Sequence, residues 1–333
     1  MLFDELNRRD LVTLLGATSI AWSPAAQAQK QMPVIAVLGS GAADASSSKM
    51  QMSLLDASMH ELGLLQGQDY VFEARWAGSD ASRFPALAAE LLARRPSAVV
   101  VSTNLAAIAV QNLSRTVPIV GTGLNAPIAT GLVASLARPG GNITGVSTMA
   151  EDVLLKLFEI MREALPDVRR VMVMTNPTNP SHQAMLDLLT VHAAKNGLSI
   201  DAASVRAPTD LDTAFAELSR QPPGALFVLT DNSLLALADP IIARALALRV
   251  PTFGNFADPF VRAGALIAYS RDPKEAFQGV ARLLHKILNG AAPGELPFEQ
   301  PTKFNLFINL TTAKALGINI PSMLLARADE VIE

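Results

Sequence analysis

Small hydroxyl and amide residues follow many of the short apolar runs in this 333-residue chain. If these runs are strands of parallel sheets, such residues gather where the strands end, which is where α/β proteins bind small molecules. Hydroxyl and amide groups exchange hydrogen bonds without a fixed charge, and helix N-termini nearby favour carboxylates. Helix capping uses the same residue types, so each residue alone has a second interpretation. The predicted ligand-binding residues are Ser40, Thr103, Asn104, Thr122, Asn176, Asp231, Asn232, Phe256 and Tyr269.

Two groups of residues have competing interpretations. Asp231 follows an expected strand, where it can meet an ammonium or hydroxyl group of a ligand or cap the helix that comes next. Phe253, Phe256 and Tyr269 can form stacking walls around a ligand, or they can pack in the core. The residues alone leave both alternatives open.

Patterns typical of catalysis and metal binding are missing from the sequence. The chain has no cysteine, and its four histidines show no HxxxH spacing. No GxSxG elbow, P-loop or GxGxxG follows the first predicted strand. We therefore expect no enzyme, no metal and no cofactor. The 27 basic and 30 acidic residues give no basic excess, so we expect no nucleic-acid partner.

Apolar runs and amphipathic stretches alternate along nearly the whole chain. Short continuous apolar runs predict strands of parallel sheets at residues 34–38, 98–101, 119–120, 171–174, 225–229 and 266–268, with a less regular strand at 70–76. Helices are expected at 50–62, 84–93, 154–165, 181–196, 211–219, 240–248 and 273–288. This alternation predicts an α/β fold, and the number of strands fits two Rossmann-like parallel sheets better than one.

Changes in composition divide the chain into two expected lobes with a ligand cleft between them. Lobe 1 is predicted at 33–143 plus about 270–300, and lobe 2 at 146–267 plus about 301–333. Chain crossings near residues 143, 270 and 300 would then form a three-crossover hinge.

The first 28 residues have the three parts of a secretory signal. Arg8 and Arg9 precede a short apolar run, and Ala26-Gln27-Ala28 supplies the small residues of a cleavage site. An apolar run of about 12 residues is too short to span a bilayer. The paired arginines favour the twin-arginine export route. We therefore expect an exported protein that does not itself span a membrane.

Several segments carry a specific resemblance. They are RRDLVTLLG at 8–16, PVIAVLGS at 33–40, GLVASLARPGGNITG at 131–145, QPTKF at 300–304, NLTTAKALG at 309–317 and PSMLLARADE at 321–330. Together these segments resemble the ABC transporter substrate-binding family that includes tryptophan and tyrosine uptake proteins. The resemblance covers essentially the whole chain.

This resemblance implies the type I periplasmic-binding fold, in which two α/β lobes close on a small ligand. It implies a monomeric periplasmic protein that captures a small polar or aromatic solute, such as an amino acid or a carboxylate, for an inner-membrane permease and its ATPase. The matching ligand-facing loops lie at Ser40, at Thr103 and Asn104, and at residues 230–232. Many relatives have Asp-Pro where this chain has Ala126-Pro127, which puts a cationic or amino-acid ligand in doubt.

Two other classes of function are alternatives. One is a ligand-binding sensory module that signals through a membrane partner. The other is an exported hydrolase on the same two-lobe scaffold.

Overall fold

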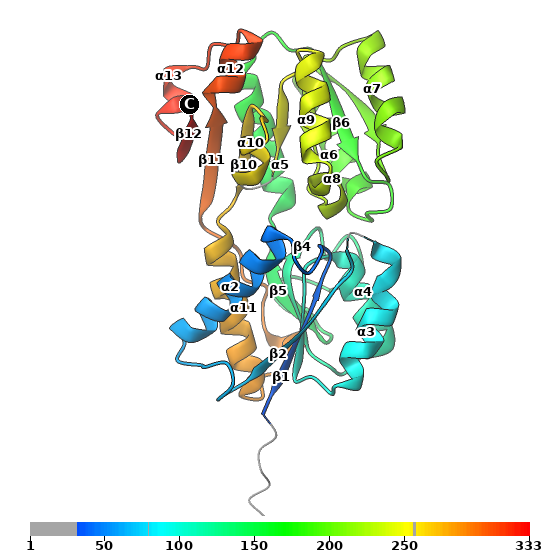
Figure 1. Cartoon of the computed structure of the whole chain (residues 1–333), viewed down its shortest axis with the longest axis vertical. Helices are drawn as coiled ribbons and strands as arrows, with labels where there is room; N and C mark the ends of the chain where they lie inside the picture. Colours follow the sequence, from blue (N-terminus) through cyan, green and yellow to red (C-terminus); the bar gives the residue numbers. More distant parts are fainter. Residues whose placement is uncertain (1–31, 79, 256–257) are drawn as a thin grey trace, which may run out of the picture. The chain divides into compact units, whose positions relative to one another are not determined.

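Two β-sheets organise the part of the chain that the structure describes (Figure 1). This computed structural model describes residues 32–78, 80–255 and 258–333, and only the backbone at 232, 258 and 259. The predicted signal at 1–28 and the candidate residue Phe256 lie outside the described residues. Both sheets belong to one unit, Pro33–Glu333.

The first sheet consists of parallel strands in the order β2-β1-β3-β4-β5. Every residue of β1 from Ile35 onward is buried, and so is every residue of β3. Such runs have no polar face to expose to water, which is why the sheet is covered by helices on both sides. The strands are β1 (Val34–Gly39), β2 (Val71–Trp76), β3 (Ala98–Val101), β4 (Ile119–Leu124) and β5 (Ile143–Ser147).

Four helices cover the first sheet, two on each face. The α3 and α4 helices pack on one face, and α2 packs on the other beside α11, which comes from much later in the chain. Asp272 caps α11 by accepting from Glu275 N at 3.0 Å, and Pro273 takes its first position. The helices are α2 (Ser46–Glu61), α3 (Phe84–Ala93), α4 (Asn104–Leu113) and α11 (Pro273–Leu288), with short 3-10 turns η1 (Ala81–Arg83) and η2 (Pro293–Glu295).

The second sheet has the order β12-β11-β10-β9-β8-β6-β7. Its strands are β6 (Arg170–Thr175), β7 (Ser199–Ser204), β8 (Ala225–Val228), β9 (Thr252–Gly254), β10 (Ile267–Arg271), β11 (Phe304–Asn309) and β12 (Glu330–Ile332). The helices around it are α5 (Ala150–Ala164), α6 (His182–Lys195), α7 (Asp210–Arg220), α8 (Asn232–Ala236), α9 (Ala238–Ala247), α10 (Asp258–Arg262), α12 (Leu310–Leu316) and α13 (Ser322–Leu325).

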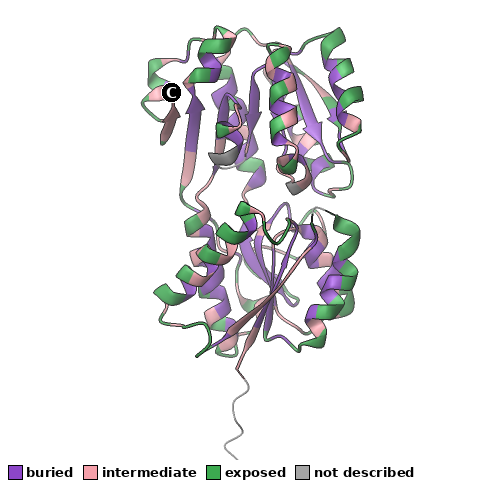
Figure 2. Cartoon of the chain, viewed as in Figure 1, coloured by how far each residue is buried: buried purple, intermediate pink, exposed green. Residues whose placement is uncertain are grey.

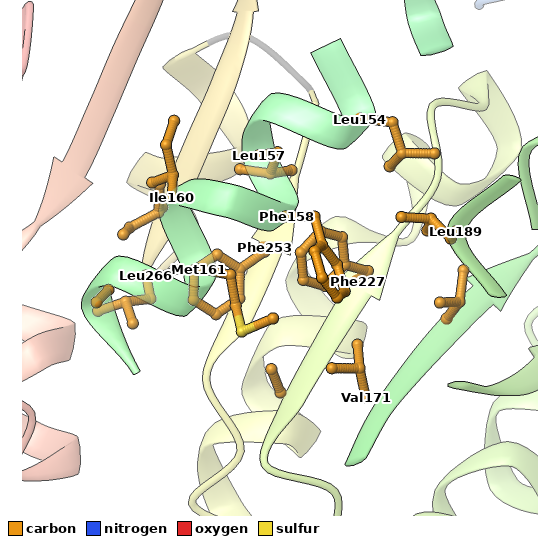
Figure 3. Close-up of a cluster of buried hydrophobic side chains, with 14 of the residues drawn as sticks. Leu154, Leu157, Phe158, Ile160, Met161, Val171, Leu189, Phe227, Phe253 and Leu266 are labelled. Atoms are coloured by element: carbon orange, nitrogen blue, oxygen red, sulfur yellow. The ribbon is translucent and has the colours of Figure 1, made fainter. Parts of the chain in front are cut away.

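Alternating residues of the strands in the second sheet point to opposite faces, and those on each face belong to a separate hydrophobic cluster. The cluster beneath α5 and α6 contains Phe158, Phe227 and Phe253, all at most 1% exposed (Figure 3). The Phe227 and Phe253 rings are stacked, with centroids 5.4 Å apart. Burying one such side chain stabilises the fold by about 1.5–3 kcal/mol. Phe253 is therefore a core residue, which decides between the two alternatives that the sequence left open for it.

The chain passes between the two sheets three times, after β5, after β10 and before β11. Ser147 N donates to Glu299 O at 2.9 Å, and Asp272 N donates to Lys303 O at 2.9 Å, so the third crossing is bonded to both others. The first crossing follows Ser147, because residues 143–147 form β5 of the first sheet. The predicted boundary at 143 mistook the Gly- and Pro-rich loop before β5 for the crossing.

One strand pair departs from the predicted parallel arrangement, since β10 and β11 are antiparallel. The chain leaves the second sheet at the end of β10, forms α11 on the first sheet, and returns beside the same crossing. Because β11 starts where β10 ends, it runs in the opposite direction.

Burial follows this layered arrangement, with buried central strands, more exposed edge strands β2, β7 and β12, and exposed outer helix faces (Figure 2). Among the described residues, no helix has the length and apolar character needed to cross a membrane.

The close approach of β4 and β5 predicts that Gly145→Ala destabilises the protein. A Cβ added to Gly145 would lie 2.5 Å from the carbonyl oxygen and 2.8 Å from the amide nitrogen of Gly121, backbone atoms that cannot move aside easily. We expect the free energy of unfolding, measured in urea, to fall by about 1–3 kcal/mol. Gly141→Ala is the control, because nothing lies within 4 Å of its added Cβ. Equal losses in both variants would contradict the steric explanation.

Candidate ligand-binding cavity

A cavity of about 280 Å³ lies at the carboxyl ends of strands from both sheets. The first sheet contributes residues after β1 and β3 and within β4, including Ser40, Ser102 and Thr122. The second sheet contributes residues at or after the ends of β6, β8, β9 and β10. Parallel strands bring these ends to the same edge of each sheet, which is the usual location of ligand sites in such folds.

The structure brings six of the nine predicted residues together in the cavity lining. Phe256 lies outside the described residues, and the side chain of Asn232, at the start of α8, is not described. Tyr269 is not among the lining residues. The six are Ser40, Thr103, Asn104, Thr122, Asn176 and Asp231.

Tyr269 packs against the hydrophobic cluster of α5 and α6. Its ring stacks on Phe304, with centroids 5.7 Å apart. The residue lies within β10 rather than beyond its end, so its ring packs along the sheet. Tyr269 therefore takes the packing alternative, and the prediction that it forms a ligand wall is corrected accordingly. Among the described lining residues, the aromatic ones are Phe84 and Phe277.

Two predicted residues of the first lobe hold the cavity wall in place. Asn104 Nδ2 donates to Asn125 O at 2.7 Å, and Asn104 Oδ1 accepts from Asn125 N at 3.0 Å. This pair of bonds fixes the loop after β4 to the start of α4. Thr103 caps α4 by accepting from Ala106 N at 3.2 Å. The capping interpretation therefore describes what these side chains do within the protein.

Asp231 is the N-cap of α8. Its Oδ1 accepts from Ser233 N at 2.9 Å and from Leu234 N at 3.3 Å. Two amides add to this: Asn176 Nδ2 donates to Oδ1 at 3.2 Å, and Asn179 Nδ2 donates to Oδ2 at 2.9 Å. Three of these bonds are to Oδ1 and one is to Oδ2, and none of the four donors carries a charge. Oδ2 therefore keeps an acceptor position.

His182 connects the ends of β6 and β8. It is 2% exposed, its Nδ1 accepts from Asn176 N at 2.8 Å, and its Nε2 lies 3.2 Å from Thr230 O. Because Nδ1 is an acceptor, the proton of the neutral ring is assigned to Nε2, which donates to the Thr230 carbonyl. Burial lowers the pKa of His182 and is opposed by the Thr230 carbonyl and the Asp231 charge.

Arg271, at the end of β10, is a lining residue that the sequence analysis did not select. Its Nη2 donates to Thr122 O of β4 at 2.5 Å, while its Nη1 is buried without a partner among the described residues. Burial lowers the pKa of Arg271 to about 10, so the guanidinium stays charged at neutral pH. An arginine three residues after the predicted apolar strand at 266–268 was the available signal. Arg271 and Asp231 are the charged residues among the described lining.

Buried polar atoms without partners concentrate in this cavity. Eight such side-chain atoms occur among the described residues, and six belong to cavity-lining residues. Leaving a buried polar group unpaired costs about 1–3 kcal/mol, so their concentration indicates groups arranged to bind something. The six atoms are Ser102 Oγ, Asn125 Oδ1, Thr230 Oγ1, Asn255 Oδ1, Ser270 Oγ and Arg271 Nη1.

The described residues show no cluster of three potential metal ligands. The cavity instead offers hydroxyl, amide and guanidinium groups beside apolar side chains, a mixture suited to holding a small organic molecule.

Known proteins show the same architecture over most of the chain. A conserved domain protein from Vibrio cholerae is 26% identical, with a TM-score of 0.83 over 90% of this chain and 100% of that one. The ABC domain from Streptococcus pneumonia in complex with L-Trp is 21% identical, with a TM-score of 0.82 over the same shares, and shows the common fold.

Sequence comparison agrees with this likeness. The tyrosine-binding protein of Clostridioides difficile (strain R20291) is 24% identical over 262 residues, which are 78% of this chain and 74% of that protein. The family described as ABC transporter substrate binding protein matches residues 32–332. This chain therefore belongs to the ABC transporter substrate-binding protein family.

Proposed function

We propose that this chain is the exported solute receptor of an ABC importer, which captures a small polar or aromatic solute and delivers it to an inner-membrane permease with its ATPase. The observation that carries the proposal is the cavity at the strand ends of both sheets, lined by buried polar atoms without protein partners. The signal-like residues 1–28 support export to the periplasm.

The dimensions of the site support a solute of amino-acid size. Ligand pockets commonly measure about 300–1,000 Å³, so a cavity of about 280 Å³ suits a small molecule. The names of two similar proteins, one tyrosine-binding and one in complex with L-Trp, point to solutes of the same size.

The three crossings support a capture mechanism by hinge motion. They are short segments at the ends of strands and helices, which are the places where two lobes can rotate without disturbing their cores. Closure around a solute would bury its polar groups against both lobes, and the permease would then receive the loaded protein.

Solute binding should stabilise the purified protein. A ligand present at about one hundred times its dissociation constant adds about 2.7 kcal/mol to the free energy of unfolding. We expect a clear rise in melting temperature with members of a panel of amino acids, aromatic acids and short carboxylates. Mass spectrometry of the purified protein would identify a solute retained from the cell. An unchanged melting temperature across this panel and across sugars and amines would contradict a receptor function.

Thr230→Val should weaken solute binding without destabilising the free protein. The Thr230 hydroxyl lines the cavity and is buried without a partner, so its removal takes a hydrogen bond from the solute and relieves an unpaired group. We expect the dissociation constant to rise about 2- to 10-fold by calorimetry, from a loss of about 0.5–1.5 kcal/mol.

Thr252→Val is a matched control for that experiment. The Thr252 hydroxyl is also buried without a partner, but Thr252 is not among the cavity-lining residues. Its replacement should leave the dissociation constant unchanged. A similar loss of affinity in both variants would show that the Thr230 hydroxyl does not act through the cavity.

From the burial of His182 we predict that the protein loses stability on mild acidification. Because the pKa of folded His182 lies below the unfolded value of about 6.5, only the unfolded chain gains a proton there as the pH falls below that value. The free energy of unfolding therefore decreases as the pH falls through this range. His182→Gln should show a smaller decrease between pH 7.5 and 5.5 than the wild type. The exposed His60→Gln is the control, and an equal change in slope for it would refute the assignment.

A further inference from the structure

We propose that the solute carries a carboxylate and that this carboxylate binds Arg271. This inference rests on the proposed function, because it specifies the ligand class of the same cavity. Three features carry it: a guanidinium without an anionic partner, a rigid setting for that guanidinium, and buried hydroxyls without partners in the same cavity.

Arg271 brings a positive charge to the cavity with no anionic partner among the described residues. Its Nη2 donates to a neutral backbone carbonyl, that of Thr122, and its Nη1 is buried and unpaired. Unpaired buried charges are strongly unfavourable, and a guanidinium presents parallel N–H groups that match a carboxylate. Arg271 therefore favours a solute with an anionic group.

Contacts from the first lobe fix the position of the guanidinium. The Thr122 carbonyl holds Nη2, and Gly123 leaves the space that Arg271 occupies, since a Cβ on Gly123 would lie 3.0 Å from Nη2. Arg271 itself ends β10, directly before the second crossing. A guanidinium held between the two lobes presents its free donors in one orientation, which limits the entropy lost when a carboxylate binds.

Nearby hydroxyls can complete the surroundings of a carboxylate. Ser102, Thr230 and Ser270 line the same cavity, and each has a buried hydroxyl oxygen without a partner. A hydroxyl can donate to a carboxylate oxygen, and hydrogen bonds to charged groups are stronger than those to neutral ones.

Asp231 is compatible with this inference whether or not the solute also has an amino group. Its four bonds come from neutral amide groups, and its Oδ2 accepts a single one of them. Oδ2 can therefore still accept from an amino group of the solute. The inference thus covers organic acids and amino acids alike.

Apolar side chains of the cavity lining indicate the character of the rest of the solute, beyond its carboxylate. Phe84, Leu105, Val153 and Phe277 line the cavity beside the polar groups. Such residues suit an aliphatic or aromatic body, and the volume of about 280 Å³ limits its size.

The test compares matched solutes by calorimetry on the purified protein. The probes are aryl and aliphatic carboxylates, each with its primary amide and its α-amino acid, for example 3-phenylpropanoate, 3-phenylpropanamide and L-phenylalanine. We expect the acid of the preferred series to bind at least about tenfold more tightly than its amide, the loss expected for a hydrogen bond to a charged group.

Two variants test whether the preference for the acid depends on Arg271. Arg271→Gln should weaken binding of the acid at least about tenfold and leave binding of the amide nearly unchanged. Gly123→Ala keeps the charge but displaces it, and should weaken the acid selectively even if Arg271→Gln fails to fold. Arg244→Gln is the control, because Arg244 pairs with Asp212 on the surface of α9 and α7 and should not affect binding.

The outcomes separate this inference from the proposed function. Tighter binding of the amide than of the acid, or an unchanged acid affinity in both Arg271→Gln and Gly123→Ala, overturns the inference and leaves the receptor function standing. Failure of acids, amides, amino acids, sugars and amines alike to bind overturns both.

Discussion

Burial of polar atoms at the ends of parallel strands is the constraint on which this molecule depends. Parallel sheets with apolar faces must be covered on both sides, so the strand ends are where polar side chains can gather. When two such sheets direct their ends at one cavity, the polar groups that are buried there need partners within reach. Some of these groups bond to the protein and others do not, and this difference gives each lining residue its role.

Side chains that bond to the protein hold the strand ends and loops around the cavity in place. Asn104 fixes the loop after β4, Asp231 caps α8, and His182 joins the ends of β6 and β8. The residues with unpaired atoms, such as Ser102, Thr230 and Arg271, are available to a solute. Sequence cannot separate the two classes, because capping and recognition use the same hydroxyl and amide residues. Counting hydrogen bonds in the structure separates them.

The sequence predicted the main strands and helices because their patterns are local. The helices at 84–93 and 273–288 were predicted with the bounds that the structure has, and buried runs such as β3 were equally clear. The α4 helix was missed, since it is apolar around much of its circumference and shows no clear periodicity. The strand β7 was missed because its residues SIDAAS are polar or small and mostly lie near the surface.

The site was less predictable for a physical reason that applies to Tyr269 and Arg271. The surroundings of both side chains depend on where β10 ends. A shift of one or two residues decides whether a side chain packs on the sheet or reaches the cavity. Arg271 also depends on Gly123 and the Thr122 carbonyl, which lie in the other lobe and about 150 positions earlier. Because the chain returns to the first lobe directly after β10, the crossing places a charged residue against that carbonyl. The guanidinium therefore meets both lobes at the hinge, where a solute that neutralises it would also favour their closure.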